Sequence, residues 1–199
     1  MKMFRESSNA AECRGGKAWR CCAWISLVLM TQASIALGAP KQEQTLFNAD
    51  PSEGITHPVP VPDPILETLT KDVSVVACVK DNPIPSNTAL ASWFAASEIH
   101  LNEPNETDIV VLPAAQGSPY LCFHSAEGIG WFWVFRKTGR QYEPVLKTSG
   151  LGLRVLDSKH NGYRDLQSES QIGGTNTETV FRFENGRYRV HQRKAEKQP

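Results

Sequence analysis

The sequence lacks the motifs that most enzyme classes require. It has no G-x-S-x-G, in which a serine nucleophile sits on a sharp turn between strand and helix. Its five histidines never occur at the H-x-H or H-x-x-x-H spacings that hold a metal. No glycine-rich phosphate loop follows a predicted strand. These absences disfavour a serine hydrolase, a histidine-based metalloenzyme and a nucleotide-binding enzyme, and we expect no cofactor and no nucleic-acid partner.

Cysteine is also scarce. Three of the five cysteines, Cys13, Cys21 and Cys22, lie near the N-terminus, and only Cys78 and Cys122 follow them. Two cysteines in an oxidising compartment usually pair, so we predict a Cys78–Cys122 disulfide; the alternative is two buried thiols. A catalytic cysteine is disfavoured because no neighbouring group would stabilise a thiolate.

The N-terminus combines basic residues with an apolar run. The run "CCAWISLVLMTQASIALGA" follows Arg20 and is interrupted by polar residues, whereas a spanning helix needs about 20 mostly apolar ones. This layout is typical of a secretory signal peptide. Small residues at Ala36 and Gly38 predict a signal peptide over 1–38, cut before Ala39, and therefore an exported, periplasmic or secreted product; the alternative is a membrane anchor. No cysteine directly follows the apolar run, so a lipid anchor on a new N-terminal cysteine is disfavoured, and we expect no integral membrane segment after cleavage.

Charge is balanced over the whole chain but unevenly distributed along it. The chain has 21 basic and 21 acidic residues. Residues 39–128 contain 3 basic and 12 acidic side chains, and residues 129–199 contain 13 basic and 7 acidic. Such asymmetry marks either a patch for an anionic partner or mutual attraction of two halves within one domain. We favour the second explanation.

Composition divides the remainder into three parts. Prolines scattered among polar residues predict a disordered linker over 39–63, because little there can offset the entropy of ordering. Residues 64–191 suffice for one β-rich domain, and a basic tail follows at 192–199. Asp63, followed by a proline, predicts a first helix. Asp72 is placed to cap a second short helix.

Beyond residue 92 the pattern predicts strands. Nine short segments rich in aromatic and β-branched residues are separated by turn residues. They are 92–101, 108–113, 119–124, 130–138, 141–148, 153–158, 163–170, 178–184 and 187–192. Asn185-Gly186, between the last two, is a strong hairpin signal. The predicted fold class is α+β, a mostly antiparallel β-sheet with a short N-terminal helical pair.

Two polar loops, "HLNEPNETDIVV" and "DSKHNGYRDLQ", share a rhythm that ends in an aspartate before an apolar residue. Aligned on this aspartate, they resemble the calcium loops of FG-GAP repeats, the integrin-type propeller motif. The resemblance implies as Ca²⁺ ligands Asn102, Asp108, Asp157, Asn161 and Asp165. His100, Pro104 and Lys159 occupy other ligand positions, so each loop keeps at most three side-chain ligands, against the 6–8 oxygens that Ca²⁺ takes. We therefore predict metal-free turns.

A wider pattern resembles a group of exported bacterial proteins with no known ligand or catalytic residue. It covers roughly Val73 to Arg189, with the LNxxxxxDhVV pattern at 101–111, "FWVFR" at 132–136, "YEPVL" at 142–146, "NGYRDL" at 161–166 and "VFRFENGRYR" near the end. The resemblance implies a bacterial extracytoplasmic protein and a β-rich fold.

The most conspicuous local feature is "GWFWVFR". Alternation places Trp131, Trp133 and Phe135 on one face of a strand and Phe132 and Val134 on the other. Apolar residues on both faces favour a central strand that is covered on both sides; the alternative is an aromatic platform for a sugar ring or a peptide. The candidate ligand-binding residues are Trp131, Trp133, Arg136, Tyr163 and Arg164.

Two functional classes compete. The first is a non-enzymatic, monomeric binding or accessory module of the cell envelope, whose partner is a glycan, a peptide or a protein. The second is a small hydrolase that uses His124, alone or paired with Asp108 or Glu127, or the carboxylates Glu98, Asp108 and Glu127. A purely structural accessory protein is a third option. We favour the binding module because titratable groups do not cluster and no motif places a nucleophile beside a base.

Overall fold

The computed structural model describes residues 43–50, 52–83, 87–102, 106–116 and 118–197, so the predicted signal peptide lies outside the described residues. The elements follow in the order β1 (Leu46–Asn48), α1 (Asp63–Leu69), α2 (Val73–Asp81), α3 (Asn87–Ala91), β2 (Phe94–Ile99), β3 (Asp108–Pro113), α4 (Tyr120–Phe123), β4 (Gly130–Thr138), β5 (Gln141–Gly150), β6 (Gly152–His160), β7 (Tyr163–Ile172), β8 (Thr175–Glu184) and β9 (Arg187–Lys197).

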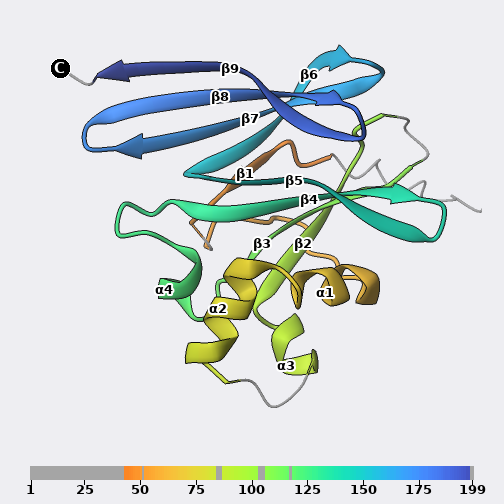
Figure 1. The fold of residues 1–199 in the computed structure, drawn as a ribbon, viewed down its shortest axis with the longest axis vertical. Helices are drawn as coiled ribbons and strands as arrows, with labels where there is room; N and C mark the ends of the chain where they lie inside the picture. Colours follow the sequence, from red (N-terminus) through yellow and green to blue (C-terminus); the bar gives the residue numbers. More distant parts are fainter. Residues whose placement is uncertain (1–42, 51, 84–86, 103–105, 117, 198–199) are drawn as a thin grey trace, which may run out of the picture. The chain divides into compact units, whose positions relative to one another are not determined.

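The strands form two antiparallel sheets. One has the order β1-β6-β7-β8-β9 and the other the order β2-β3-β4-β5. Helices α1, α2 and α3 lie against the four-stranded sheet, on the side away from the five-stranded one (Figure 1). The predicted α+β class, mostly antiparallel sheet with short helices, is confirmed.

Strand β4 belongs to two hydrophobic cores. Phe132 and Val134, both 0% exposed, pack in the core between the two sheets. Trp133 and Phe135 point the opposite way and pack with α1, α2 and the aromatic residues near α4. Because side chains alternate along a strand, one segment closes both layers. The prediction of a central strand covered on both sides is confirmed.

The chain passes from one sheet to the other through a single residue, Leu151, between β5 and β6. At this crossing the Leu151 N–H donates to the carbonyl of Glu169 at 2.6 Å. A Cβ on Gly150 would lie 2.5 Å from the same carbonyl oxygen. The close approach of β7 therefore requires glycine at position 150.

Two hairpins of the five-stranded sheet use the turn chemistry that their sequences predict. The central residues of the β8–β9 turn, Asn185 and Gly186, have φ angles of 51° and 85°. In the β6–β7 turn, Asn161 and Gly162 have φ angles of 51° and 82°. Positive φ at both central residues gives the twist that a two-residue hairpin needs. The predicted β8–β9 hairpin is confirmed.

The predicted linker over 39–63 is wrong in its described part. Strand β1 pairs with β6, and Phe47 is 0% exposed in the core between the sheets. A bridge between Val59 and Ala96 attaches a further part of the segment to β2. The segment has too few apolar residues to be ordered on its own. It is ordered because its apolar residues pack into the core that the sheets form.

Two predicted segments near α4 and the C-terminus also differ from the structure. Residues 120–123, predicted as a strand, form the short helix α4. The predicted basic tail at 192–199 continues as part of β9 up to Lys197. Pairing with β8 supplies the hydrogen bonds that keep this polar segment extended.

No described helix is long and apolar enough to cross a bilayer.

Phe135→Ala tests the second core of β4. We expect it to lower the free energy of unfolding by about 3–5 kcal/mol, because a fully buried aromatic side chain is lost and a cavity remains. Leu121→Ala is the matched control, since Leu121 is 90% exposed and should change stability by less than about 0.5 kcal/mol. Urea unfolding measures both; equal effects would contradict the assignment of Phe135 to the core.

Candidate functional site

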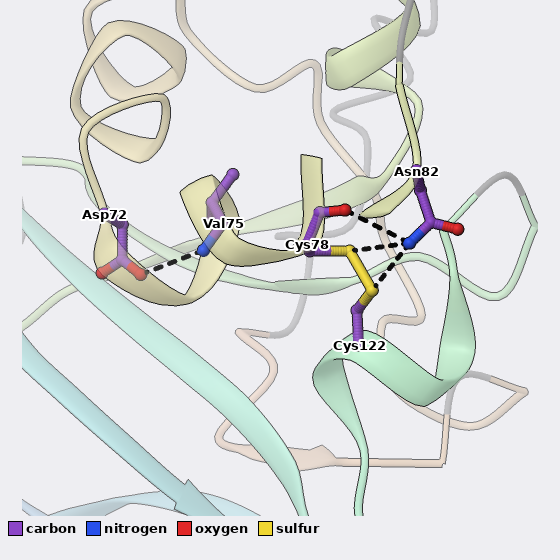
Figure 2. Close-up of a disulfide and its surroundings, with 5 residues drawn as sticks. All are labelled: Asp72, Val75, Cys78, Asn82 and Cys122. Carbon is purple, nitrogen blue, oxygen red and sulfur yellow. Dashed lines mark hydrogen bonds between the residues drawn. A yellow bond between two sulfur atoms is a disulfide. The ribbon is translucent and has the colours of Figure 1, made fainter. Parts of the chain in front are cut away.

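A disulfide joins α2 to α4. Cys78 and Cys122 are bonded, with Cα atoms 5.4 Å apart, which confirms the predicted pairing. Figure 2 shows the amide of Asn82, the C-cap of α2, directed at this bridge. Its Nδ2 lies 3.2 Å from the Cys122 Sγ and 3.2 Å from the Cys78 carbonyl oxygen. The bridge and the amide together fix the C-terminal end of α2.

Asp72 fixes the other end of α2. It is the N-cap, and its Oδ1 accepts the N–H of Ser74 at 2.9 Å. It also accepts the N–H of Val75 at 3.4 Å (Figure 2). The same carboxylate accepts the indole N–H of Trp133 at 3.2 Å and the ammonium of Lys147 at 2.8 Å. The predicted capping role of Asp72 is confirmed, and it also ties the helix to β4 and β5.

Burial opposes the charge on Asp72, but the hydrogen bonds from Lys147, Trp133 and Ser74 outweigh it and hold the pKa of Asp72 below its ordinary value. The Asp72 side chain is 16% exposed, and that of Lys147 is 26% exposed. The ion pair is therefore partly shielded from solvent, where a charged hydrogen bond is stronger than on an open surface.

Lys147 connects this ion pair to Trp131. Its Nζ donates to the Ser74 Oγ at 2.8 Å and lies 4.4 Å from the centroid of the Trp131 ring. The negative face of an indole attracts an ammonium at this distance. Trp131 is only half-buried, and the lysine ammonium covers one face of its ring.

A groove of 740 Å³ runs between α2 and α4. We call it the α2–α4 groove. Its walls are Ser74, Ala77, Cys78, Asp81, Asn82, Pro119, Leu121, Cys122 and Trp131. The lining combines an aromatic ring and apolar side chains with a hydroxyl, an amide and a carboxylate, the composition of a site for a small polar ligand.

A second groove of 380 Å³ is also lined by Trp131. We call it the Ile172 groove, after the residue at the end of β7 that contributes to it. Its walls are Cys122, Phe123, His124, Ser125, Glu127, Ile129, Trp131, Ser149 and Ile172. Both grooves share Cys122 and Trp131, so the half-exposed indole stands where they adjoin.

Of the two predicted tryptophan contacts, the structure places only Trp131 on these grooves. Trp133 is 3% exposed and lies among Phe94, Phe123 and Phe135 in the helix-covered core. Its indole N–H is used by Asp72. Trp133 is therefore a core residue, because the helices cover the middle of β4 but not its start.

The other predicted contacts, Arg136, Tyr163 and Arg164, line neither groove. Arg136 donates to Glu143 at 2.6 Å and to the Tyr163 hydroxyl at 3.2 Å, which joins β4 to β7. Arg164 is 12% exposed and pairs with Glu43 at 2.8 Å. These guanidinium groups link separate parts of the fold, and their contact with a ligand stays a prediction.

The first of the two loops that resemble FG-GAP calcium loops ends at a buried aspartate. Asp108 is 0% exposed, and its carboxylate accepts the N–H of Leu101 at 3.0 Å and that of Lys137 at 2.8 Å. Burial raises the pKa of Asp108, against the effect of these two hydrogen bonds. The Asn102 amide donates to Glu106 at 3.0 Å. The aspartate thus anchors the connection from β2 to β3.

The second loop is the β6–β7 hairpin. Asp165 is 2% exposed and lies 2.8 Å from both the Ser158 Oγ and the His160 Nδ1. The Asn161 amide donates to the Phe183 carbonyl at 2.9 Å. The exposed Asp157 pairs with Arg164 at 3.3 Å. Among the described residues no group of three or more acidic, histidine or cysteine side chains is arranged to hold a metal ion.

The candidate catalytic groups are only partly brought together. His124 and Glu127 line the Ile172 groove, whereas Glu98 and Asp108 line neither groove. His124 is 7% exposed, and its Nε2 lies 2.9 Å from the Ala49 carbonyl oxygen. A carbonyl can only accept, so Nε2 carries the proton. The imidazole is thus anchored in the wall of the groove.

No protein-family model matches this chain, and no curated protein and no solved structure is significantly similar to it. The resemblance of the two loops to FG-GAP repeats therefore stays a prediction. The geometry of the grooves is the basis for a functional proposal.

Sequence reasoning missed the helical wall of the α2–α4 groove. Ser74, Asp81 and Asn82 occur in a short segment that has no motif of its own. One signal was present, because the predicted Cys78–Cys122 bridge necessarily brings the end of α2 close to the segment that precedes Trp131.

Asp72→Asn tests the link between α2 and the sheet. We expect a loss of about 1–3 kcal/mol at pH 7, because the partly buried ion pair with Lys147 is lost while the cap remains possible. The folded-state pKa of Asp72 lies below its ordinary 3.8. Its contribution is therefore present above about pH 4 and is lost as the pH falls further, so the difference from wild type should shrink there.

Asp157→Asn is the matched control, because Asp157 is fully exposed and forms its ion pair at the surface. Urea unfolding at pH 7 and in acid measures both variants. A loss for Asp72→Asn that is the same at every pH would show that its charge contributes nothing.

Proposed function

We propose that this protein is an exported, non-enzymatic binding module whose ligand lies against Trp131. The observation that carries the proposal is the position of this indole, half-exposed and flanked by two grooves, with the Lys147 ammonium over one face of its ring. A rigid aromatic surface offers a large contact area at a low entropic cost.

The charges of the grooves favour a ligand without negative charge. Asp81 contributes a carboxylate to the α2–α4 groove, and Glu127 contributes one to the Ile172 groove. No lysine or arginine is among the described residues that line either groove. The nearby ammonium of Lys147 is occupied by Asp72 and Ser74. An anionic ligand would meet repulsion here without a compensating cation.

A neutral glycan fits this chemistry. Its hydroxyl groups can donate to the carboxylates of Asp81 and Glu127 and to the side-chain oxygen of Asn82. Its C–H groups carry partial positive charge and suit the negative face of an indole. Because both grooves are lined by Trp131, a linear oligosaccharide could extend from one groove into the other past the indole.

Export rests on the predicted signal peptide and is supported by the disulfide. A Cys78–Cys122 bridge is stable in an oxidising compartment and rare in a reducing one. A glycan of the cell envelope is a ligand that such a protein would meet.

The competing function is a hydrolase, and it is favoured by one observation, the presence of His124 and Glu127 in the same groove. The anchoring of His124 Nε2 on the Ala49 carbonyl supports a structural role for this ring instead. Cleavage of a bound oligosaccharide that stops in His124→Gln would establish the hydrolase.

Trp131→Ala tests the binding module. With a panel of neutral linear hexasaccharides as probes, we expect wild-type protein to bind at least one, and the variant to bind it at least about tenfold more weakly, since an aromatic contact contributes more than about 1.4 kcal/mol. Trp131→Phe should retain part of the affinity. Calorimetry measures binding, and circular dichroism shows that the variants fold.

Val190→Ala serves as the control, because Val190 is an exposed apolar residue that lines neither groove. Failure of every hexasaccharide to bind would rule out a neutral glycan as the ligand. Equal affinity of wild type and Trp131→Ala for a bound sugar would rule out Trp131 as the binding site.

A further inference from the structure

Strand β9 forms an exposed edge of the five-stranded sheet. It spans Arg187–Lys197 and pairs with β8 on one side only within the described chain (Figure 1). All its side chains are exposed except that of Tyr188, which is 5% exposed. A long edge strand presents unpaired backbone N–H and C=O groups along its free side.

The side chains of β9 are strongly basic. The strand contains five lysine and arginine residues and a single acidic residue, Glu196. Glu196 pairs with Lys194 at 2.5 Å. The four remaining cations, Arg187, Arg189, Arg193 and Lys197, form no ion pair with any described residue.

One cross-strand contact adds to this unbalanced charge. Arg189 stands directly opposite Arg182 of β8. Like charges at opposed positions of an antiparallel pair destabilise it. The nearest carboxylate to Arg182 is Asp165, at 3.8 Å, and Asp165 is already contacted by His160. The described chain therefore leaves an excess of positive charge along β9.

A bulge distributes these cations over both faces of the sheet. Phe181 and Phe183 face the core, so Arg182 and its partner Arg189 face the opposite side. The register shifts between Val180 and Phe181. Beyond the shift, Arg193 is opposite Thr179, which is buried on the same side of β8 as Phe181. The extra residue of a bulge thus places Arg193 and Lys197 on the other face from Arg189.

We propose that the free edge of β9 binds an extended acidic segment of a partner polypeptide as an additional strand. The side chains of an added strand alternate between the two faces, so its carboxylates can reach Arg189 on one face and Arg193 on the other. Backbone hydrogen bonds to the edge supply the pairing. A polyanion lying on one face would reach only part of the set.

A second copy of this chain is a poor occupant of the same edge. Pairing of β9 with β9 would place two basic strands side by side, with five cations against one carboxylate in each. Such repulsion prevents edge-to-edge association. The proposed site lies apart from the two grooves, neither of which is lined by β9.

The test uses the chain without the predicted signal peptide, residues 39–199. The probe is a fluorescein-labelled twelve-residue peptide of alternating threonine and glutamate. The variant R189Q/R193Q removes one cation from each face and should weaken binding about five- to tenfold at low salt. R140Q/K159Q removes the same net charge from exposed residues outside β9 and should leave the affinity within about twofold.

A second peptide of the same charge, N-methylated at alternate residues, distinguishes strand addition from attraction by charge alone. We expect it to bind at least about tenfold more weakly, because it lacks the N–H groups that pair with the edge. Hydrogen exchange should show β9 amides protected by the unmodified peptide. No binding, equal binding of the methylated peptide, or an equal loss in R140Q/K159Q would each overturn the proposal.

Discussion

The burial of β4 on both faces is the constraint on which the rest of the structure depends. Phe132 and Val134 close the core between the sheets, while Trp133 and Phe135 close the core beneath the helices. A register slip of one residue would exchange the two sets and disrupt both cores. Trp131 continues the second face, but it lies at the start of the strand, where the helical cover ends. Its half-exposed indole is therefore a consequence of the same alternation that buries its neighbours.

Helix α2 forms a wall of the α2–α4 groove together with Trp131, and the helix is held at both ends. Asp72 ties its first turn to Trp133 and Lys147, and Cys78 ties its last turns to Cys122. Only Val75 and Cys78 are buried along its length, while Val73 and Val76 are exposed. A nine-residue helix with so small an apolar face would have little stability alone. The tethers therefore hold the groove wall in place, which would reduce the entropy lost on binding of the proposed ligand.

The sequence predicted those strands whose bounds are determined by a local apolar pattern. The predicted bounds of β3 and β4 agree with the structure, because their apolar patterns and flanking turns are unambiguous. Strand β1 could not be predicted, since Phe47 is its only buried residue and its partner strand β6 lies far along the chain. In "YLCF" four apolar residues show no period, so strand and helix were indistinguishable. The hydrogen bond between Arg136 and Tyr163 could not be predicted either, because only the packing of the two sheets brings these residues together.

The uneven charge of the chain has two different outcomes in the fold. Part of it is neutralised between the halves, as the sequence suggested: Glu43 pairs with Arg164 and Asp72 with Lys147, and each pair attaches an N-terminal element to a C-terminal strand. The remainder is segregated. Asp81 and Glu127 stay on the groove walls, whereas four of the cations that form no ion pair with a described residue lie on β9. Opposite charges that could have neutralised one another are thus held on separate surfaces. If both proposals hold, this separation would make the two surfaces differ in specificity, because each surface would repel a ligand that carries the charge suited to the other.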